Sequence, residues 1–584
     1  MIKLLKNMRR KEKGMALICV LLVVGQVYFD LRLPDYMTEL TTLIKTSGTT
    51  ADIAGVGMKM LGCALISALL AVGCGYLAAK TASGFSFTVR EKLFHHVMDI
   101  GNEEMQDFSV PSLITRTTND ITQIQMIVSM GLQMMIKAPI MAVWAVIKIL
   151  GKSWELSAVT AGFVVALFTS VTLIMSSCLP RFRQVQKMTD KINRVARENL
   201  TGINVVHAFH AEQFQNDKFD VPSKAMMDLQ MKNQKLFALI QPTMSLGMNG
   251  LALTVYWVGA ALVDRISVTD PAGRLAMFSE VLVFGTYATY VVMSFMMLAM
   301  IFMLLPQAQV SAERINEVLD RDSVVREGKC TEGSEVGAVE FRKVSFRYPH
   351  ASADALTDID FKIRRGETLA IIGATGSGKS TLVGLIPRFY DVTEGEVLVD
   401  GVNVKNYSFD ALYDKLGYVT QKAVLFSGTV RDNVLFGESL ASDDPEALPR
   451  SIALSQAGEF VNALPEGTDH EIAQLGRNVS GGQKQRLAIA RALARHPEIL
   501  IFDDSFSALD YRTAASLREG LAKQLRDTTK IIVAQRISTI RHADRIIVLD
   551  RGVAVGSGTH EELMRDCTVY REIAMSQLSA SELA

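Results

Sequence analysis

The stretch Ile371–Thr381, "IIGATGSGKST", decides the fold of the C-terminal half of this chain. It has the spacing G-x-x-x-x-G-K-[ST], it follows an apolar run typical of a buried strand, and it leads into the helix-like "STLVGLI". That context is the one the motif requires. Glycines let backbone N–H groups surround phosphate oxygens, and the start of a helix adds favourable partial charge. The stretch therefore predicts a nucleotide-binding loop between a strand and a helix.

Each residue type in this loop has a chemical role. Lys379 is predicted to reach the terminal phosphates, and the Ser380 hydroxyl to bind Mg²⁺. The residues expected to contact the nucleotide are Gly373, Thr375, Gly376, Ser377, Gly378, Lys379, Ser380 and Thr381.

A second stretch, "ILIFDDSFSALD" at Ile499–Asp510, places two carboxylates directly after a buried strand. Asp503 closes that strand, where a carboxylate can hold Mg²⁺ through a water molecule. The next residue, Asp504, is the candidate general base for an attacking water. The alternative for Asp503, an ordinary strand-end aspartate, has little weight beside the phosphate-binding loop.

A third motif, "NVSGGQKQRLAIARAL", begins at Asn478. Ser480, Gly481 and Gly482 come just before a helix predicted to start near Gln483. A hydroxyl and free N–H groups at a helix N-terminus suit an anion. Alone the motif could be a helix cap, but its place shortly before the strand that ends at Asp503 makes it specific.

The N-terminal half of the 584-residue chain has a different texture. Six apolar runs there each come near or above the ~20 residues that a membrane helix needs. They span residues 14–36, 57–80, 129–150, 154–178, 237–263 and 276–306. The first lacks a small-residue cleavage site, so we expect a membrane span rather than a signal peptide. Basic residues gather at the N-terminus and in segments 80–125 and 180–236, which predicts that both termini lie in the cytoplasm.

The remaining composition excludes other classes of protein. The 61 basic and 61 acidic residues balance, so no nucleic-acid partner is expected. The six cysteines have no metal-like spacing and predict no disulfide framework. Residues 321–337 are polar and aperiodic, and the strand-like and helical runs alternate after them. The predicted fold is an α-helical six-span membrane domain (1–320), a linker (321–337) and an α/β P-loop domain (338–584).

Together these motifs make the chain resemble the ATP-binding cassette (ABC) half-transporters of the exporter type, over essentially its whole length. The resemblance implies that Tyr348 in "FRYP" stacks on adenine, as aromatic rings do on bases. It implies that Gln421 senses Mg²⁺ and contacts the membrane domain, and that Asp510 lies in a loop crossing a dimer interface. The signature Ser480–Gln483 would grip the γ-phosphate of ATP held by the other cassette. One chain carries one cassette, so a second half-transporter is required as partner.

The resemblance also places two coupling segments, at Ser109–Gln123 and Asn204–Phe219. In such transporters these segments press on the cassettes and transmit their closure to the membrane helices. Solvated helical hairpins would have the same composition, and only the resemblance separates the two interpretations.

Two positions depart from the family pattern. Most cassettes have glutamate where this chain has Asp504, which is one methylene shorter, roughly 1.5 Å less reach. The resemblance also places a histidine where this chain has Gln535, whose amide carries no titratable proton. ATP is therefore expected to be bound well and hydrolysed slowly at this P-loop, as in one subunit of heterodimeric bacterial exporters. The alternative is a homodimer in which Asp504 is an adequate base.

Within the spans, Lys137 and Lys148 are candidate functional residues. Both can instead reach an interface with their long side chains, which we favour near a span's end. Asp30 and Arg32 in "FDLRLP" can pair with each other or mark the outer end of the first helix. Abundant methionine suits an adaptable apolar pocket, although lipid-facing or helix-packing roles are more common.

The predicted function is ATP-driven export of hydrophobic or amphipathic compounds across a bacterial plasma membrane, with ATP and Mg²⁺ as cofactors. No peptidase-like segment precedes the first span, which argues against a leader-cleaving peptide exporter. Import of a metal chelate or nutrient by the same fold, and a purely regulatory ATP-binding subunit, are the alternatives.

Overall fold

The computed structural model describes residues 1–45, 49–150, 153–437 and 444–577. It divides into two compact units. One comprises Met1–Met98 and Val110–Asp320, and the other Asp99–Ser109 and Arg321–Ala584. Each is described separately below.

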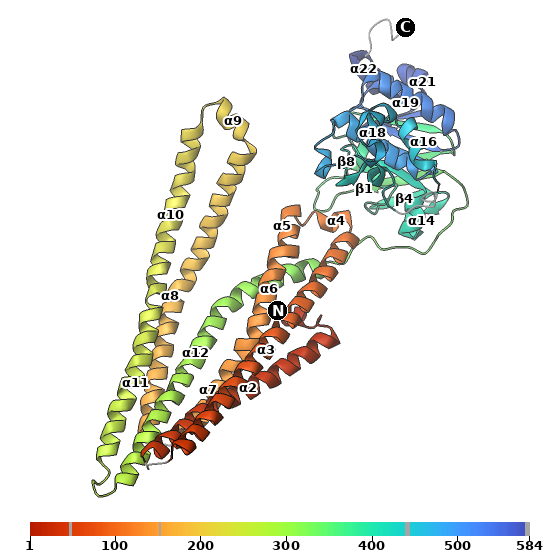
Figure 1. The fold of residues 1–584 in the computed structure, drawn as a ribbon. Helices are drawn as coiled ribbons and strands as arrows, with labels where there is room; N and C mark the ends of the chain where they lie inside the picture. Colours follow the sequence, from red (N-terminus) through yellow and green to blue (C-terminus); the bar gives the residue numbers. More distant parts are fainter. Residues whose placement is uncertain (46–48, 151–152, 438–443, 578–584) are drawn as a thin grey trace. The chain divides into compact units, whose positions relative to one another are not determined.

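The first unit consists of long helices (Figure 1). Among the residues described, six helical stretches are long and apolar enough to cross a membrane, and each overlaps one of the six predicted runs. They are α2 (Arg10–Lys45), α3 (Thr50–Asp99), α6–α7 (Ile121–Met130, Ile136–Leu150), α8 (Trp154–Thr201), α11 (Ile240–Asp264) and α12 (Pro271–Leu319). The 50 residues of α3 continue as helix well beyond their apolar part, as the periodicity of "FTVREKLFHHVMDI" predicts.

Two features break the regularity of the third span. π-helical turns occupy Arg116–Asp120 (η1) and Gly131–Met135 (η2), on either side of α6. The helix α5 (Val110–Thr115) precedes them. Such turns shift the angular register of the residues that follow, and they occur frequently at functional sites.

Charged residues within the spans pair differently from the prediction. Asp30 and Arg32 do not pair with each other: Asp30 pairs with Lys137 at 3.2 Å, and Arg32 donates hydrogen bonds to Tyr28. They do not end the first helix either, because α2 continues through Pro34 to Lys45. The nearest neighbour in sequence was the wrong partner because the carboxylate of Asp30 faces α7, not its own helix.

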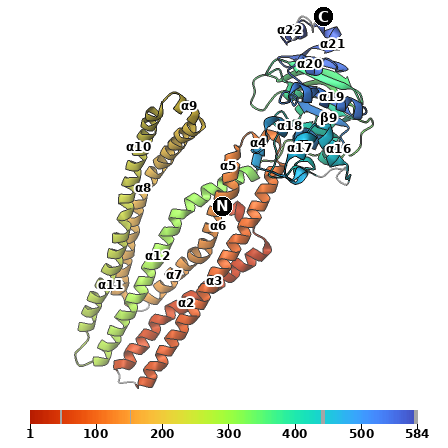
Figure 2. The same ribbon diagram turned by 45° about the horizontal axis from the view of Figure 1, so that its top comes forward.

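A helical arm extends from the bundle. Helix α10 (Glu212–Ala238) runs beside α8, and the short α9 (Ile203–Ala208) joins them at the tip in both ribbon views (Figures 1 and 2). The predicted segment Asn204–Phe219 forms this tip, and its phenylalanines Phe209 and Phe214 are exposed.

The second unit contains two sheets. The smaller one is mainly antiparallel, in the order β2-β1-β4-β5, with β1 at Val339–Phe346, β2 at Leu356–Ile363, β4 at Glu394–Val399 and β5 at Val402–Asn403. The larger one has the order β12-β11-β3-β10-β9-β6. Its strands are β3 (Thr368–Gly373), β6 (Leu416–Val419), β9 (Ile499–Asp503), β10 (Thr529–Val533), β11 (Arg545–Asp550) and β12 (Val553–Gly558).

The order of the larger sheet positions the site. Strands β11, β3, β10, β9 and β6 run parallel to one another, whereas the edge strand β12 pairs antiparallel with β11. The carboxyl ends of neighbouring parallel strands meet at one edge, where ligands bind in open α/β sheets. The loops after β3, β10, β9 and β6 carry the P-loop, Gln535, Asp504 and Gln421, so residues far apart in sequence converge.

A helical subdomain has a core of its own. Helices α15 (Val430–Val434), α16 (Ala447–Leu454), α17 (Gly458–Ala463) and α18 (Gly481–Ala494) surround it, and α16–α18 lie together in Figure 2. Leu425, Val430, Phe460 and Leu487 belong to this core.

Residues 321–338 contain neither helix nor strand. They are nevertheless tied to the second unit, because the backbone N–H groups of Gly328 and Cys330 donate to Tyr407 O and Asn406 O, both at 2.8 Å.

Candidate nucleotide site

The P-loop follows β3, whose residues are almost all buried. Gly376 and Gly378 have φ angles of +83° and +96°, conformations that residues with a Cβ rarely adopt. A Cβ on Gly378 would also come within 2.8 Å of the carbonyl oxygen of Ala355. The helix α13 (Lys379–Gly384) begins immediately afterwards. The glycine spacing is therefore required by the backbone itself.

Most of the predicted site residues line one cavity of about 570 Å³. They are Tyr348, Thr375, Gly376, Gly378, Lys379, Ser380, Thr381, Gln421, Asp504 and Gln535. Gly373 and Ser377 lie within the loop, where the ammonium of Lys379 donates to Gly373 O at 2.8 Å and Ala374 O at 2.7 Å. Burial lowers the pKa of Lys379, and the nearby charges of Asp504 and Asp503 oppose that shift.

The pair Ser380–Asp503 offers hard oxygen ligands. The Ser380 hydroxyl donates to Asp503 Oδ1 at 2.8 Å. Burial raises the pKa of Asp503, and hydrogen bonds from Ser380 and Tyr418 oppose the shift. A hydroxyl and a carboxylate brought together beside a phosphate-binding loop are the donor set that Mg²⁺ prefers. These residues fit the predicted metal.

Asp504 accepts two amide donors on one oxygen. Gln535 Nε2 donates to Asp504 Oδ2 at 2.7 Å, and Gln421 Nε2 approaches the same atom at 3.4 Å. The Asp504 backbone is held with φ +49° and its N–H donates to Val533 O at 3.1 Å. The side chain of Gln421 thus faces Asp504 and lines the same cavity as Ser380, and its role toward Mg²⁺ stays a prediction.

The switch segment that carries Gln535 is held from the C-terminal helix α22 (Thr568–Gln577). The side chain of Gln577 donates to Gln535 O at 2.8 Å and accepts from the N–H of Ile537 at 2.9 Å. Nothing in the sequence pattern pointed to this contact, because it joins residues that are 42 positions apart.

Tyr348 has an aromatic and a polar neighbour. Its hydroxyl shares a hydrogen bond with Thr381 Oγ1 at 2.9 Å, and its ring packs edge-on against Tyr390 with centroids 5.4 Å apart. The ring remains at the wall of the cavity, as adenine stacking needs.

The signature residues do not join this cavity. Ser480 caps α18: its Oγ accepts from Gln483 N at 3.3 Å, while the Gln483 side chain accepts from Ser480 N at 2.8 Å. Gly481 and Gly482 form the first turn of α18. Asp510 likewise caps α19 (Tyr511–Gln524) and is exposed, and its hydrogen bonds with Thr513 lower its pKa. Within one chain, these residues and the P-loop are separate.

Sequence reasoning missed several residues of the site. Tyr418 of β6 reaches Asp503, and Asp354, Ala355, Val533, Arg551 and Gly552 line the cavity. They belong to no motif, and only the folding of β2, β10 and the β11–β12 turn beside the P-loop brings them there.

One predicted coupling segment is displaced. Of Ser109–Gln123 only Ser109 belongs to the second unit, and the segment that packs there is Asp99–Ser109 with the short helix α4 (Asn102–Met105). Gln106 Nε2 donates to the Tyr390 hydroxyl at 2.8 Å and Glu104 accepts from Val324 N at 2.6 Å. Arg116, by contrast, pairs with Glu317 of α12 within the first unit. Residues 99–123 contain two short helices, α4 and α5, separated by the non-helical residues 106–109, and the composition alone does not say which of the two packs in the second unit.

Comparisons with known proteins agree with this architecture. Residues 16–295 match the family model "ABC transporter transmembrane region" and residues 356–507 the model "ABC transporter". An uncharacterized ABC transporter ATP-binding protein of Mycobacterium tuberculosis is 37% identical over 100% of this chain and 99% of its own length. An ATP-dependent lipid A-core flippase of Aromatoleum aromaticum is 31% identical, over 93% of this chain and 91% of its own.

A solved structure described as a bacterial Atm1-family ABC exporter with ATP bound has a TM-score of 0.81, at 23% identity over 98% of this chain and 99% of that one. This likeness concerns the fold. Six candidate membrane helices followed by a P-loop domain define a membrane protein driven by nucleotide. The chain belongs to the ABC transporter family, and its cassette is an ATPase whose hydrolysis is coupled to transport.

Proposed function

We propose that this chain is one half of a heterodimeric ABC exporter that moves hydrophobic or amphipathic compounds out across a bacterial plasma membrane. Both termini lie in the cytoplasm. Its own P-loop holds ATP with Mg²⁺ on Ser380 and Asp503 and hydrolyses it slowly. Its signature, Ser480–Gln483, completes the faster site on the partner. The flippase relative and the exporter-like fold favour the outward direction.

One observation carries the proposal. The two departures from the family pattern meet at a single atom, because Gln535 donates to Asp504 Oδ2 at 2.7 Å. A general base must be free to accept a proton from water at hydrogen-bond distance. Here the short carboxylate is fixed by its backbone and one oxygen is occupied by an amide, which cannot take the proton onward. Nucleotide binding does not depend on that atom.

The test is hydrolysis by the purified chain alone in lipid nanodiscs, with ATP binding measured in the same sample. Binding with hydrolysis about 10² or more below that of a competent cassette supports the proposal, since general-base catalysis contributes 10²–10⁴. Lys379→Ala is the control that removes binding and hydrolysis together. Rapid hydrolysis by the isolated wild-type chain would overturn it.

A homodimeric exporter is the second candidate. It is favoured by the position of Asp504 at the wall of the cavity, where its second oxygen, Oδ1, has no hydrogen bond among the contacts described for this residue. In that case Asp504→Asn would abolish a substantial wild-type rate.

A further inference from the structure

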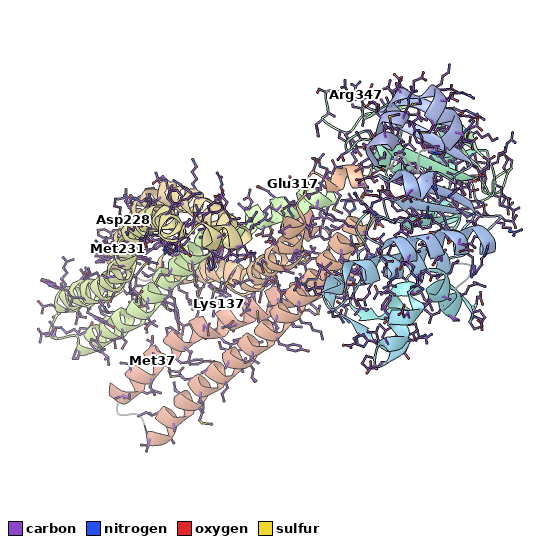
Figure 3. The ribbon with its side chains drawn as sticks, turned by 90° about the horizontal axis from the view of Figure 1, so that it is seen from above. Met37, Lys137, Asp228, Met231, Glu317 and Arg347 are labelled. Atoms are coloured by element: carbon purple, nitrogen blue, oxygen red, sulfur yellow. The ribbon has the colours of Figure 1, made fainter. Side chains whose placement is uncertain are left out.

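A polar cluster lies inside the helical bundle of the first unit, apart from the nucleotide site. Asp30 of α2 accepts from the Ser67 hydroxyl of α3 at 2.5 Å and from the Lys137 ammonium of α7 at 3.2 Å. Tyr290 of α12 is close enough to interact electrostatically with Asp30. Four spans therefore contribute to one site, and Figure 3 labels Lys137 within the bundle.

Charged side chains deep within membrane spans carry a high free-energy cost. Lys137 precedes the end of α7 at Leu150 by about 20 Å, from the helical rise of 1.5 Å per residue. A hydrocarbon core is only about 30 Å thick, so neither charge lies at a span's end. Ionisable groups at such depth are rare, and they mark ligand or ion pathways. Snorkelling to an interface, which the sequence suggested, does not describe Lys137.

Lys137 has N–H donors that the hydrogen bonds of this cluster do not use. Both oxygens of Asp30 accept a bond. An ammonium has three N–H donors. Among the residues that the structure describes, Lys137 donates only to Asp30. Its side chain is 18% exposed, so a ligand can reach it. The cluster can thus take a further acceptor group, and an anion fits best.

The local backbone is adapted to this position. The π-helical turn η2 ends one residue before Ile136 and thereby sets the direction of Lys137. Gln133 of the same turn stands one turn before the lysine and faces Gly75 of α3, whose Cβ position would lie 3.9 Å from Gln133 Oε1.

Helix α12 also lines an apolar cavity, beginning at Val292, two residues after Tyr290. It has a volume of about 450 Å³ and its lining includes Leu167, Phe168, Met244, Val292, Phe295 and Met296. Tyr290 and Val292 lie about 200° apart around α12, so the cavity is on the other side of this helix from the Asp30–Lys137 cluster. The bundle thus offers a polar cluster for a charged head group and, separately, apolar space for a hydrocarbon body.

We propose that Lys137 binds the anionic head group of an amphiphile within the helical bundle of the first unit. This rests on the proposed export of amphipathic compounds and narrows it to anionic ones. Lys137 exchanges part of its interaction with Asp30 for the ligand, and Asp30 keeps the ammonium charged while the site is empty. A carboxylate, sulfate or phosphate head group supplies the shared chemistry.

The second ion pair provides a matched control. Lys148 pairs with Asp35 at 2.7 Å, but it lies two residues from the end of α7. The Tyr287 hydroxyl also donates to Asp35 at 2.6 Å. Lys148 and Asp35 thus form an ion pair of the same two residue types, but near the end of α7 instead of deep within it.

The test uses the full chain in nanodiscs without ATP and a matched pair of probes, dansyl-labelled undecanoic acid and its methyl ester. The acid is expected to bind at least about tenfold more tightly than the ester, the effect of one charge-assisted hydrogen bond. Lys137→Met removes that preference and Lys148→Met retains it. Asp30→Asn retains or increases it, because the ammonium is then free.

A merely structural ion pair gives a different pattern, in which Asp30→Asn and Lys137→Met weaken binding of both probes alike. That result, or equal wild-type affinity for acid and ester, would overturn the proposal. The double variant Asp30→Asn/Lys137→Met leaves no unpaired charge, so it should fold and bind both probes equally even where Lys137→Met does not fold. Because the assay contains no nucleotide, a rapid ATPase would refute the slow-site proposal without affecting this result.

Discussion

Replacing Asp504 and Gln535 by the glutamate and histidine that most cassettes carry should raise the rate of ATP hydrolysis at this P-loop. Asp504→Glu adds one methylene, roughly 1.5 Å of reach. Gln535→His removes the amide that donates to Asp504 Oδ2 at 2.7 Å. A hydrogen bond to a charged group is worth about 1.5–3 kcal/mol, so the release of this bond alone accounts for roughly ten- to a hundredfold in rate. Adding the base's reach, we expect the double variant to hydrolyse ATP at least about 10² faster than wild type.

The assay is steady-state Mg²⁺-dependent phosphate release at saturating ATP from nanodiscs that each hold two copies of the full chain, so that the signature of one copy can complete the P-loop site of the other. Nucleotide binding is measured for every variant. Gln535→Ala separates the two effects, because it frees Asp504 without lengthening it, and a partial gain is expected. Asp504→Asn keeps the shape and removes the base, so the residual rate should fall further. If Gln535→Ala alone gave the full increase, reach would not be limiting; if the double variant gave none, the contact at Asp504 would not explain slow hydrolysis.

Three other predictions concern the second unit. Tyr348→Ala should weaken ATP binding about fivefold or more, since base stacking is worth about 1–3 kcal/mol. Tyr348→Phe loses only the bond to Thr381 and should stay within about twofold of wild type. Fluorescent-nucleotide titration checks this, and equal losses in the two variants would contradict stacking. Burial raises the pKa of Asp503 above its unfolded value near 4, so the nucleotide-free protein should lose stability as pH rises from about 4 through that raised pKa. Thermal melts should show that the Tm of Asp503→Asn depends less on pH than the Tm of wild type. The same pH dependence of Tm in both proteins would contradict this prediction. Tyr390→Phe removes the hydrogen bond from Gln106, which is worth about 1 kcal/mol. Amide hydrogen exchange in residues 99–109 should therefore become faster, and Gln106→Ala should have the same effect. Unchanged exchange in both variants would mean that this bond does not hold the segment.

Sequence patterns predict this protein well wherever a physical period or a local backbone need dictates the residues. The six spans follow from continuous apolar length, and the P-loop from glycines that must adopt positive φ. Asp503 was recognisable because a buried strand ended in a carboxylate.

Contacts between distant segments could not be predicted in the same way. The bond from Gln535 to Asp504 depends on β10 lying beside β9, which no motif states. Lys137 and Asp30 are 107 positions apart, and each has several charged neighbours nearer in sequence. The docking of residues 99–109 rather than 109–123 depends on whether the residues around α4 or those around α5 lie beside Tyr390.

The contact of Gln577 with the switch segment has a practical consequence. One side chain at the end of α22 holds both the carbonyl of Gln535 and the N–H of Ile537, so the position of Gln535 depends on the integrity of that helix end. A truncation that removes Gln577 therefore removes the side chain that positions a residue of the ATP site. Hydrolysis rates measured with and without an intact α22 are not comparable for that reason.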